Sequence, residues 1–242
     1  MNEQNIIVKY VPNFVTLLSL SSGFTSISFS LNNEWKIAIY LILLATIFDF
    51  FDGWFARKFK SGSNFGAELD SLSDLVSFGI APSILVFLWS TNSLGSLGWG
   101  STLFFVICSS LRLARFTADI YITNKPIDYN EYFVGIPSPA AAGLILLPLI
   151  IFFEFNIDFL KNEYLNFFST IIVGFMMISK IPTISLKKIN INNKYKNLIF
   201  LIFVIISVGL VSKIWITLII VFGFYLLSIF YTVIKSRKII KR

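Results

Sequence analysis

Four aspartates are concentrated in one short stretch of an otherwise apolar chain. Asp49, Asp52, Asp70 and Asp74 lie within 26 residues, although the whole sequence of 242 residues contains only seven Asp. Residues three or four apart share a face of a helix, so each pair projects from one side of its own helix. The short loop between the helices brings the pairs together, and four carboxylates at close quarters repel unless cations neutralise them. The spacing therefore predicts a site for one or two hard divalent metal ions.

Small residues and one arginine are interleaved with these carboxylates. Gly53, Ala56 and Gly66 would let a ligand approach the backbone closely, and Arg57 offers a planar fork of donors suited to phosphate. Taken alone, Gly53 or Ala56 could equally serve to pack helices, as small residues do in membranes. Beside metal-binding carboxylates, the combination indicates a diphosphate site in which a carboxylate accepts the proton of an attacking hydroxyl.

The composition limits both the environment and the chemistry of the protein. The chain is 56% hydrophobic and only 14% charged, against ~45–50% apolar residues in an ordinary soluble domain. We therefore expect an all-α integral membrane protein. The absence of His and the single Cys, Cys108, exclude His-ligated metals, His-dependent catalysis and an internal disulfide. The net charge of +7 is interpreted as membrane topology and attraction to lipid headgroups, without a nucleic-acid partner.

Eight apolar stretches are long enough to cross a bilayer, whose ~30 Å hydrocarbon core requires about 20 residues per helix. An interfacial helix is expected to precede them near the N-terminus. The result is a multi-span helical bundle of about eight transmembrane helices. The spans are predicted near residues 12–31, 36–56, 70–90, 97–118, 138–155, 164–184, 197–212 and 214–234.

The distribution of basic residues predicts how this bundle is oriented in the cell membrane. Seventeen of the 20 Lys and Arg fall on one side of the eight spans, and only Lys36, Lys161 and Lys213 fall on the other. Cytoplasmic loops are rich in Lys and Arg. Both termini and the four carboxylates are therefore predicted to be cytoplasmic.

The carboxylate segment resembles the signature of a known enzyme family. It reads Asp49-x2-Asp52-Gly53-x2-Ala56-Arg57-x8-Gly66-x3-Asp70-x3-Asp74. All eight fixed residues are similar to those of the CDP-alcohol phosphatidyltransferases, integral membrane enzymes that transfer a phosphatidyl group from a CDP-linked lipid to an alcohol. Such a pattern would recur by chance at on the order of 1 in 10¹⁰ start positions if all residue types were equally frequent.

The resemblance implies roles for the motif residues. Asp49, Asp52 and Asp70 resemble metal ligands, and Asp74 resembles both a ligand and the general base. The metals implied are two divalent cations, Mg²⁺ or Mn²⁺, while Ca²⁺ could occupy the site without activating it. The cytidine diphosphate would be received by Asp49, Asp52, Gly53, Ala56, Arg57, Gly66 and Asp70.

The resemblance also implies an architecture. Residues 1–242 would form a single membrane-embedded domain, with a six-helix catalytic core over about 12–184 and additional spans over about 197–234. The enzyme would be a homodimer whose site opens toward the cytoplasmic leaflet.

Two further stretches bear on the acceptor alcohol. Residues Ser110 to Phe116 and Phe133 to Ala142 are similar to segments of the phosphatidylserine synthase branch, which also commonly has eight spans. Thr117 and Ile136 depart from that branch, where Asn and Leu are common. The branch resemblance implies CDP-diacylglycerol and L-serine as substrates, with phosphatidylserine and CMP as products.

Three residues in or beside these stretches are candidates for binding the acceptor or the lipid phosphate. Arg112 and Arg115 share one helix face, where they could hold the donor phosphate or the serine carboxylate, or simply snorkel to the interface. Pro137 and Pro139 punctuate the start of a helix. Ser138 between them either only begins that helix or donates to the acceptor.

Other functions remain open from the residues alone. The same chemistry would serve glycerol 3-phosphate, inositol, inositol phosphate or choline as the acceptor. A divalent-cation transporter would also use clustered carboxylates, but it would leave Gly53, Arg57 and Gly66 unexplained.

Overall fold

The described part of the chain folds almost entirely into helices. The computed structural model describes residues 3–59, 61, 63–121, 133–179, 182–183 and 193–240. The longer helices are α1 (Glu3–Leu31), α2 (Trp35–Phe59), α3 (Asn64–Asp74), α4 (Ala81–Trp89), α5 (Ser96–Tyr121), α6 (Ser138–Phe155), α7 (Glu163–Ile178), α8 (Asn193–Ser212) and α9 (Ile214–Ile240). The short elements are the π-helix η1 (Leu75–Ile80), the 3-10 helices η2 (Thr91–Leu94) and η4 (Asp158–Lys161), and the strands β1 (Phe133–Val134) and β2 (Pro182–Thr183).

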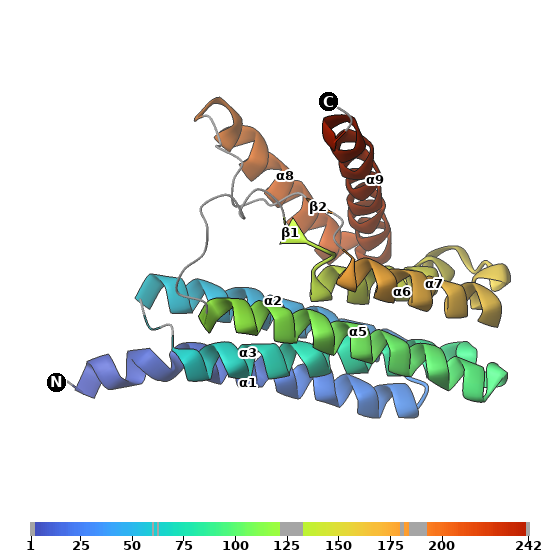
Figure 1. Ribbon diagram of the computed structural model, residues 1–242, viewed down its shortest axis with the longest axis horizontal. Coiled ribbons are helices and arrows are strands. Elements are labelled where there is room, and N and C mark those ends of the chain that lie inside the picture. Colours follow the sequence, from blue (N-terminus) through green and yellow to red (C-terminus); the bar gives the residue numbers. More distant parts are fainter. Residues whose placement is uncertain are drawn as a thin grey trace.

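Several of these helices have the length and apolar composition of membrane spans. In the described part of the chain, five segments qualify: Tyr10–Leu31, Trp35–Phe59, Asn64–Trp89, Ser96–Ala118 and Ser138–Phe155. Glu163–Ile178 and Ile214–Ile229 are shorter apolar helices. The predicted class, a multi-span helical membrane protein, is confirmed. Figure 1 shows α1, α2, α3 and α5 side by side along the long axis, with α8 and α9 rising from one side.

The first helix is longer than its predicted span. α1 runs from Glu3 to Leu31 with Pro12 inside it, so the segment expected to form an interfacial helix is continuous with the first span. Several basic residues on which the predicted orientation depends lie outside the described residues: Lys60, Lys125, Lys180, Lys187, Lys188, Lys241 and Arg242.

The third predicted span, near 70–90, contains a widened turn that the sequence pattern did not indicate. It begins at Asn64, and η1 separates α3 from α4 directly after Asp74. The Ala81 N–H donates to the Val76 carbonyl, five residues earlier, as a π-helix requires. Pro82 has no N–H to donate, and the hydroxyl of the next residue, Ser83, donates to the Gly79 carbonyl at 2.8 Å. The helix thus changes its register next to the carboxylates.

The sixth predicted span, 164–184, is too long at its C-terminal end. α7 ends at Ile178, and the Ser179 N–H donates to the Phe175 carbonyl at 3.0 Å. Pro182 and Thr183 form β2, which pairs antiparallel with β1. The physical reason is Pro182, which cannot donate a helical hydrogen bond.

The last two predicted spans correspond to separate helices. Lys213 alone interrupts the helical run between α8 and α9. Its N–H donates to the Gly209 carbonyl at 2.8 Å, and its own carbonyl accepts from the Thr217 N–H at 3.0 Å. Gly209 also faces the Thr217 side chain, so the absence of a side chain there lets the two helices approach closely.

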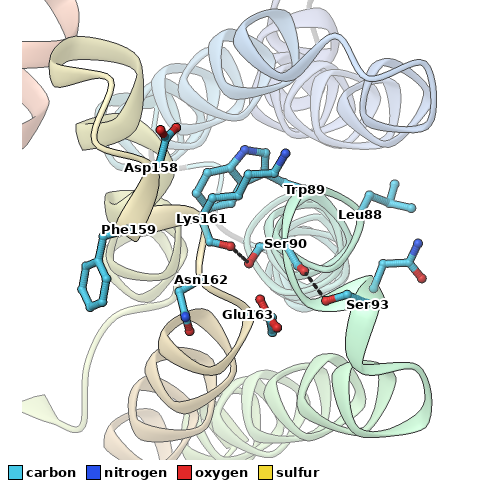
Figure 2. Close-up of a pocket in the computed structure, with 10 residues that line it drawn as sticks. Leu88, Trp89, Ser90, Ser93, Asp158, Phe159, Lys161, Asn162 and Glu163 are labelled. Atoms are coloured by element: carbon cyan, nitrogen blue, oxygen red, sulfur yellow. Dashed lines mark hydrogen bonds between the residues drawn. The ribbon is translucent and has the colours of Figure 1, made fainter.

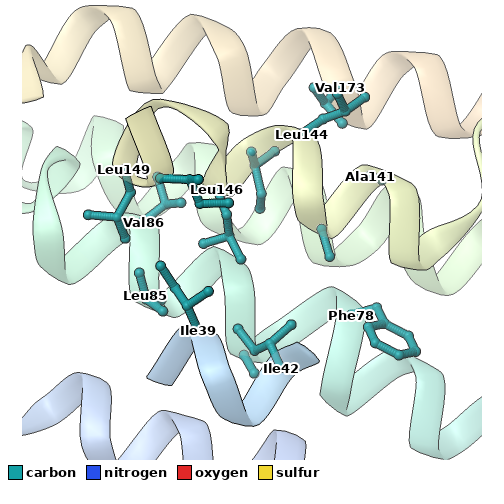
Figure 3. Close-up of a cluster of buried hydrophobic side chains, with 14 of the residues drawn as sticks. Ile39, Ile42, Phe78, Leu85, Val86, Ala141, Leu144, Leu146, Leu149 and Val173 are labelled. Atoms are coloured by element: carbon teal, nitrogen blue, oxygen red, sulfur yellow. The ribbon is translucent and has the colours of Figure 1, made fainter. Parts of the chain in front are cut away.

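The hydrophobic core lies between α2, α4 and α6. Figure 3 shows Ile39 and Ile42 of α2 facing Leu85 of α4, with Leu146 and Leu149 of α6 completing the cluster. All five side chains are at most 3% exposed. This core joins α2 and α6 through α4, and so relates the carboxylates on α2 to the segment that precedes α6.

Candidate functional site

Three of the four motif aspartates converge in space. Each of Asp49, Asp70 and Asp74 offers a carboxylate oxygen, and these oxygens all lie within 4.8 Å of one another. Asp49 lies near the end of α2, whereas Asp70 and Asp74 lie on consecutive turns of α3. Oxygen atoms at such separations can share a hard cation. The structure therefore brings together the residues predicted to hold metal, while their role as ligands stays a prediction.

Serine hydroxyls of α1 fix the helix that carries Asp49. Ser19 donates to the Ala45 carbonyl at 3.0 Å, and Ser26 donates to the Ala38 carbonyl at 2.9 Å. Both serines are at most 1% exposed. Since no water competes in an apolar environment, such bonds between helices add directly to close packing. These bonds fix the position of Asp49 along the axis of α1.

The helix that carries Asp70 and Asp74 is fixed to α1 in the same way. Ser73 donates to the Thr16 carbonyl at 3.2 Å, and Ser77 donates to the Ser19 carbonyl at 3.1 Å. Gly23 lies against Ser77, where a Cβ atom would overlap it. Because both carboxylate-bearing helices hydrogen-bond to α1, this helix acts as the common support of the cluster.

The fourth motif aspartate, Asp52, lies beside the group of three and faces a cavity. Asp52 is only 5% exposed, and the cavity has a volume of about 170 Å³. It is lined by Pro12, Asn13, Thr16, Asp52, Gly53, Ala56, Ser61, Ser63, Gly66, Ala67 and Asp70. Five of the seven residues expected to receive the nucleotide diphosphate are among them.

The two remaining residues of that set lie around the cavity without lining it. Asp49 belongs to the carboxylate group, and Arg57 is exposed on the last turns of α2. The Arg57 guanidinium folds back over Gly53, where a Cβ atom would lie 3.3 Å from its Nη1 atom. Gly53 thus leaves room for a cationic group at the edge of the cavity.

Two polar side chains lie close to Gly66, in the first turn of α3. The Gly66 N–H donates to the Ser63 hydroxyl at 3.0 Å, which caps the helix, and a Cβ atom on Gly66 would lie 3.0 Å from Asn13 Oδ1. The absence of a side chain at Gly66 keeps this wall of the cavity open.

The predicted acceptor residues form a second polar group close to the carboxylates. Arg112 on α5 is only 7% exposed, and its Nη1 atom donates to the Ser138 hydroxyl at 2.8 Å. The guanidinium also covers the Phe116 ring at 4.6 Å and interacts electrostatically with Asp74 and Arg115. Arg112 therefore does not snorkel to the interface. It points into the protein, between the carboxylate group and the start of α6.

A glycine in the left-handed region places Ser138 at the start of α6. Gly135 has φ = 82°, and a Cβ atom there would overlap the Met177 carbonyl oxygen. The next N–H, that of Ile136, donates to the Met176 carbonyl at 3.3 Å. These contacts join the segment before α6 to the end of α7 and explain why α6 begins where the prolines predict.

Thr117, where the phosphatidylserine synthase branch commonly has Asn, connects two helices. Its hydroxyl lies 2.8 Å from the hydroxyl of Ser71, a residue of α3 between Asp70 and Asp74. Thr117 is 8% exposed, so this bond joins α5 to α3 inside the protein. It holds the helix that carries Arg112 beside the helix that carries two of the carboxylates.

Several buried polar atoms at this site lack hydrogen-bond partners among the described residues. They include Asp52 Oδ2, Asp74 Oδ1 and Arg112 Nε. Buried polar atoms are nearly always paired, and each exception needs an explanation. Carboxylate oxygens left open suit a divalent cation, and an open guanidinium N–H suits an anion. The site thus fits a metal-bound anionic substrate.

The sequence matches the model of a known protein family. Residues 9–183, nearly three quarters of the chain, match the family model described as CDP-alcohol phosphatidyltransferase. The chain belongs to this family. The matched residues include all the motif aspartates together with Arg112 and Ser138, and the resemblance seen in the motif is confirmed.

Curated relatives in bacteria and archaea carry one common name, CDP-diacylglycerol–serine O-phosphatidyltransferase. The chain is 33% identical to the Mycobacterium leprae protein over 78% of this chain and 62% of the relative. It is 33% identical to the Helicobacter pylori protein over 76% of this chain and 75% of the relative. It is 36% identical to the Methanocaldococcus jannaschii protein over 83% of this chain and 82% of the relative. The chain thus spans less than two thirds of the mycobacterial relative.

A larger cavity lies at the other end of the helical bundle. It has a volume of about 790 Å³ and opens between the end of α4 and the η4–α7 junction. Figure 2 shows Ser90 donating to the Lys161 carbonyl, at 2.9 Å, with Ser93 donating back to the Ser90 carbonyl. Because these bonds satisfy backbone groups at helix ends, we interpret this cavity as a junction between helices and not as the reaction site.

Some residues of the candidate site were not foreseen from the sequence. Asn13, Thr16, Ser61 and Ser63 line the cavity beside the motif residues. Ser63 had a readable signal, since it precedes a helix and its side chain caps it. The signal for Asn13 and Thr16 was weaker: they are polar residues, three apart, at the start of an apolar span.

Proposed function

We propose that this protein transfers the phosphatidyl group of CDP-diacylglycerol to the hydroxyl of L-serine, releasing CMP and forming phosphatidylserine. The observation that carries the proposal is the convergence of Asp49, Asp70 and Asp74 beside the buried Arg112–Ser138 pair. The names of the relatives support the same reaction. Asp74 interacts electrostatically with Arg112, so an acidic group and a cationic group lie near each other. This arrangement suits a reaction between an anionic lipid donor and an amino-acid acceptor.

The donor diphosphate would lie over the carboxylate group. Asp49, Asp70 and Asp74, with Asp52 at the side, would hold two divalent cations, Mg²⁺ or Mn²⁺. When bound, these cations neutralise charge on the phosphate oxygens as the transition state forms. The open carboxylate oxygens of Asp52 and Asp74 support this arrangement.

The nucleotide would occupy the cavity formed by α1, α2 and α3. Gly53, Ala56 and Gly66 leave its walls open, and Arg57 at its edge would donate to a phosphate oxygen. The acyl chains of the donor would extend into the surrounding lipid between helices. The exposed apolar side chains of Phe50, Phe51 and Leu72, near the carboxylates in sequence, support this position.

Asp74 would act as the general base. It accepts the proton of the serine hydroxyl, the serine oxygen attacks the phosphorus attached to diacylglycerol, and the bond from phosphorus to the CMP oxygen breaks. Of the motif aspartates, Asp74 interacts electrostatically with Arg112, so a serine held by Arg112, Arg115 and Ser138 would have its hydroxyl near this carboxylate. Direct displacement requires no covalent intermediate on the protein.

The proposed orientation places both termini and the site on the cytoplasmic side of the cell membrane. The three basic residues assigned to the opposite side support it. Lys36 lies over the Phe153 ring at 5.3 Å, and the backbone of Lys161 bonds to Ser90 at the far end of α4. Lys213 precedes Trp215, whose ring packs on Phe153. We further propose a single domain that assembles as a homodimer, as the family resemblance implies.

The proposal is tested by offering acceptors one at a time. Purified full-length protein in lipid micelles receives CDP-diacylglycerol and Mg²⁺ or Mn²⁺, together with serine, glycerol 3-phosphate, inositol, inositol phosphate or choline. CMP release is measured, and the lipid product is identified by mass spectrometry. CMP and phosphatidylserine formed only with serine would support the proposal. Another alcohol as the acceptor would overturn the serine assignment, and no CMP with any acceptor would favour the cation-transport alternative.

A further inference from the structure

The last helix packs along α6 in the opposite direction. The Trp215 ring of α9 lies 5.3 Å from the Phe153 ring near the end of α6, and the Phe222 ring lies directly against Gly143, nearer its start. Moving along α9 toward its C-terminus therefore moves toward the first residues of α6. Tyr225, one turn after Phe222, reaches the level of the Arg112–Ser138 pair.

Tyr225 belongs to the face of α9 that packs on the rest of the protein. Leu218 and Ile229 on this face are 5% and 4% exposed, and Phe222, Tyr225 and Leu226 pack against the same core. Their spacing of three to four residues is that of one side of a helix. The aromatic ring of Tyr225 is thus held in place by packing, which leaves its hydroxyl in a fixed position.

The Tyr225 hydroxyl is buried and has no hydrogen-bond partner in the part of the chain that the structure describes. Its neighbour Arg112 interacts with it electrostatically, and Arg112 Nε is likewise buried without a partner. The Arg112 Nε–H can only donate, the Tyr225 hydroxyl can donate or accept, and the two atoms do not bond each other. The hydrogens of both groups are therefore open inside an apolar protein, and a bound acceptor would satisfy them both.

The groups around this position favour an anion. Arg112 brings a positive charge, and Ser138, whose oxygen already accepts from Arg112, keeps its own hydrogen to donate. We propose that Tyr225 completes an anion pocket with Arg112 and Ser138, and that its hydroxyl donates a hydrogen bond to an anionic oxygen of a bound substrate. The inference rests on the proposed function and extends its site to α9, which lies outside the residues matched by the family model.

The anionic oxygen has two sources in the proposed reaction. One is the carboxylate of the amino-acid acceptor, and the other is the phosphate of the lipid donor. The two sources share the chemistry that Tyr225, Arg112 and Ser138 would recognise. They differ in which substrate binds more weakly when the Tyr225 hydroxyl is removed.

The test uses Tyr225→Phe in the full-length protein, with Tyr231→Phe as the matched control. Tyr231 is on the same helix but 63% exposed, so its hydroxyl faces away from the pocket. We expect Tyr225→Phe to raise the KM of one substrate roughly 10–100-fold, as for a lost hydrogen bond to a charged group, and Tyr231→Phe to leave both KM values unchanged.

The two sources are distinguished by which KM rises. If the partner is the acceptor carboxylate, the KM for serine rises and that for CDP-diacylglycerol does not. With 2-aminoethanol, which has the hydroxyl and the amine but no carboxylate, Tyr225→Phe and wild type would then react equally. If the partner is the donor phosphate, the KM for CDP-diacylglycerol rises with either acceptor.

Two results would contradict the proposal that Tyr225 completes an anion pocket. One is an active Tyr225→Phe variant whose KM values both lie within twofold of wild type. The other is a Tyr225→Phe variant that unfolds at a lower temperature than wild type, because a hydroxyl without a partner contributes nothing to the unliganded fold. Wild-type protein that releases no CMP in the presence of serine would instead contradict the proposed function itself, and so the two failures are distinguishable.

Discussion

The two halves of the site are built in different ways. The carboxylate half comes from consecutive helices, α2 and α3, and all four aspartates lie within 26 residues of sequence. The other half, the proposed anion-binding half, draws Arg112 from α5, Ser138 from α6 and, by our inference, Tyr225 from α9. The first half is therefore visible as a sequence motif, whereas the second exists only when distant helices pack together.

The two halves also differ in how they are held. Serine hydroxyls bond the carboxylate helices to the backbone of α1, as Ser19 and Ser77 illustrate. The other half depends on a glycine in the left-handed region, Gly135, and on ring packing such as that of Phe222 on Gly143. Under the proposed function, the difference teaches that the reaction chemistry is encoded locally, while the choice of acceptor depends on tertiary packing.

The largest effect is expected from removing the proposed base in the carboxylate half. Asp74→Asn keeps the size of the side chain but cannot accept the proton, so the rate of CMP release should fall by about 10²–10⁴-fold. Asp158→Asn, at an exposed position near the far end of the bundle, is the matched control and should leave the rate unchanged. Near-normal turnover by correctly inserted Asp74→Asn would refute the base assignment.

A smaller effect is expected in the other half from Arg112→Lys. Lysine keeps the charge but lacks the planar guanidinium, whose Nη1 atom bonds Ser138 and whose Nε–H is open to a ligand. A hydrogen bond to a charged group contributes about 1.5–3 kcal/mol. We expect a fall in kcat/KM of about 10–100-fold. The metal concentration that gives half-maximal activity should stay unchanged. A changed metal requirement would mean that the two halves are not functionally separate.

Replacing a proposed metal ligand should have the opposite result: a changed metal requirement with little change in the KM for serine. Asp70→Asn should raise the concentration of Mn²⁺ or Mg²⁺ needed for half-maximal activity by about tenfold or more, since even residues outside the direct ligand shell affect metal affinity by this amount. The KM for serine, measured at saturating metal, should change little. An unaltered metal titration would count against a direct role of Asp70 in metal binding.

The smallest effect is expected from the support of the anion-binding half. Gly135→Ala places a side chain at φ = 82° against the Met177 carbonyl, and such strain costs about 1–3 kcal/mol. The variant should unfold at a lower temperature in detergent and bind serine more weakly. Gly100→Ala is the control, because no atom lies within 4 Å of its added Cβ. Equal unfolding temperatures for the two variants would contradict this account of Gly135.

The sequence was informative wherever the determinants are local. The spacing of Asp49, Asp70 and Asp74 predicted their convergence, and Pro137 and Pro139 predicted where α6 begins. The π-helix after Asp74 was not predicted, because a single widened turn leaves no periodic pattern in an apolar run.

Residues that act through long-range packing could not be predicted in this way. Asn13 and Thr16 line the cavity only because α1 packs between the two carboxylate helices. Tyr225 is one of nine Tyr in the chain, and the packing of α9 on α6 buries its hydroxyl while Tyr231 stays exposed.

The central claim is that the acceptor oxygen attacks phosphorus directly at the carboxylate site. The most direct test follows the stereochemistry at the transferred phosphorus, with CDP-diacylglycerol made chiral by oxygen isotopes or a single sulfur substitution at that atom. One displacement inverts the configuration, so we expect phosphatidylserine of inverted configuration from wild-type protein. Retention would show two successive displacements through an intermediate on the protein and would contradict the account.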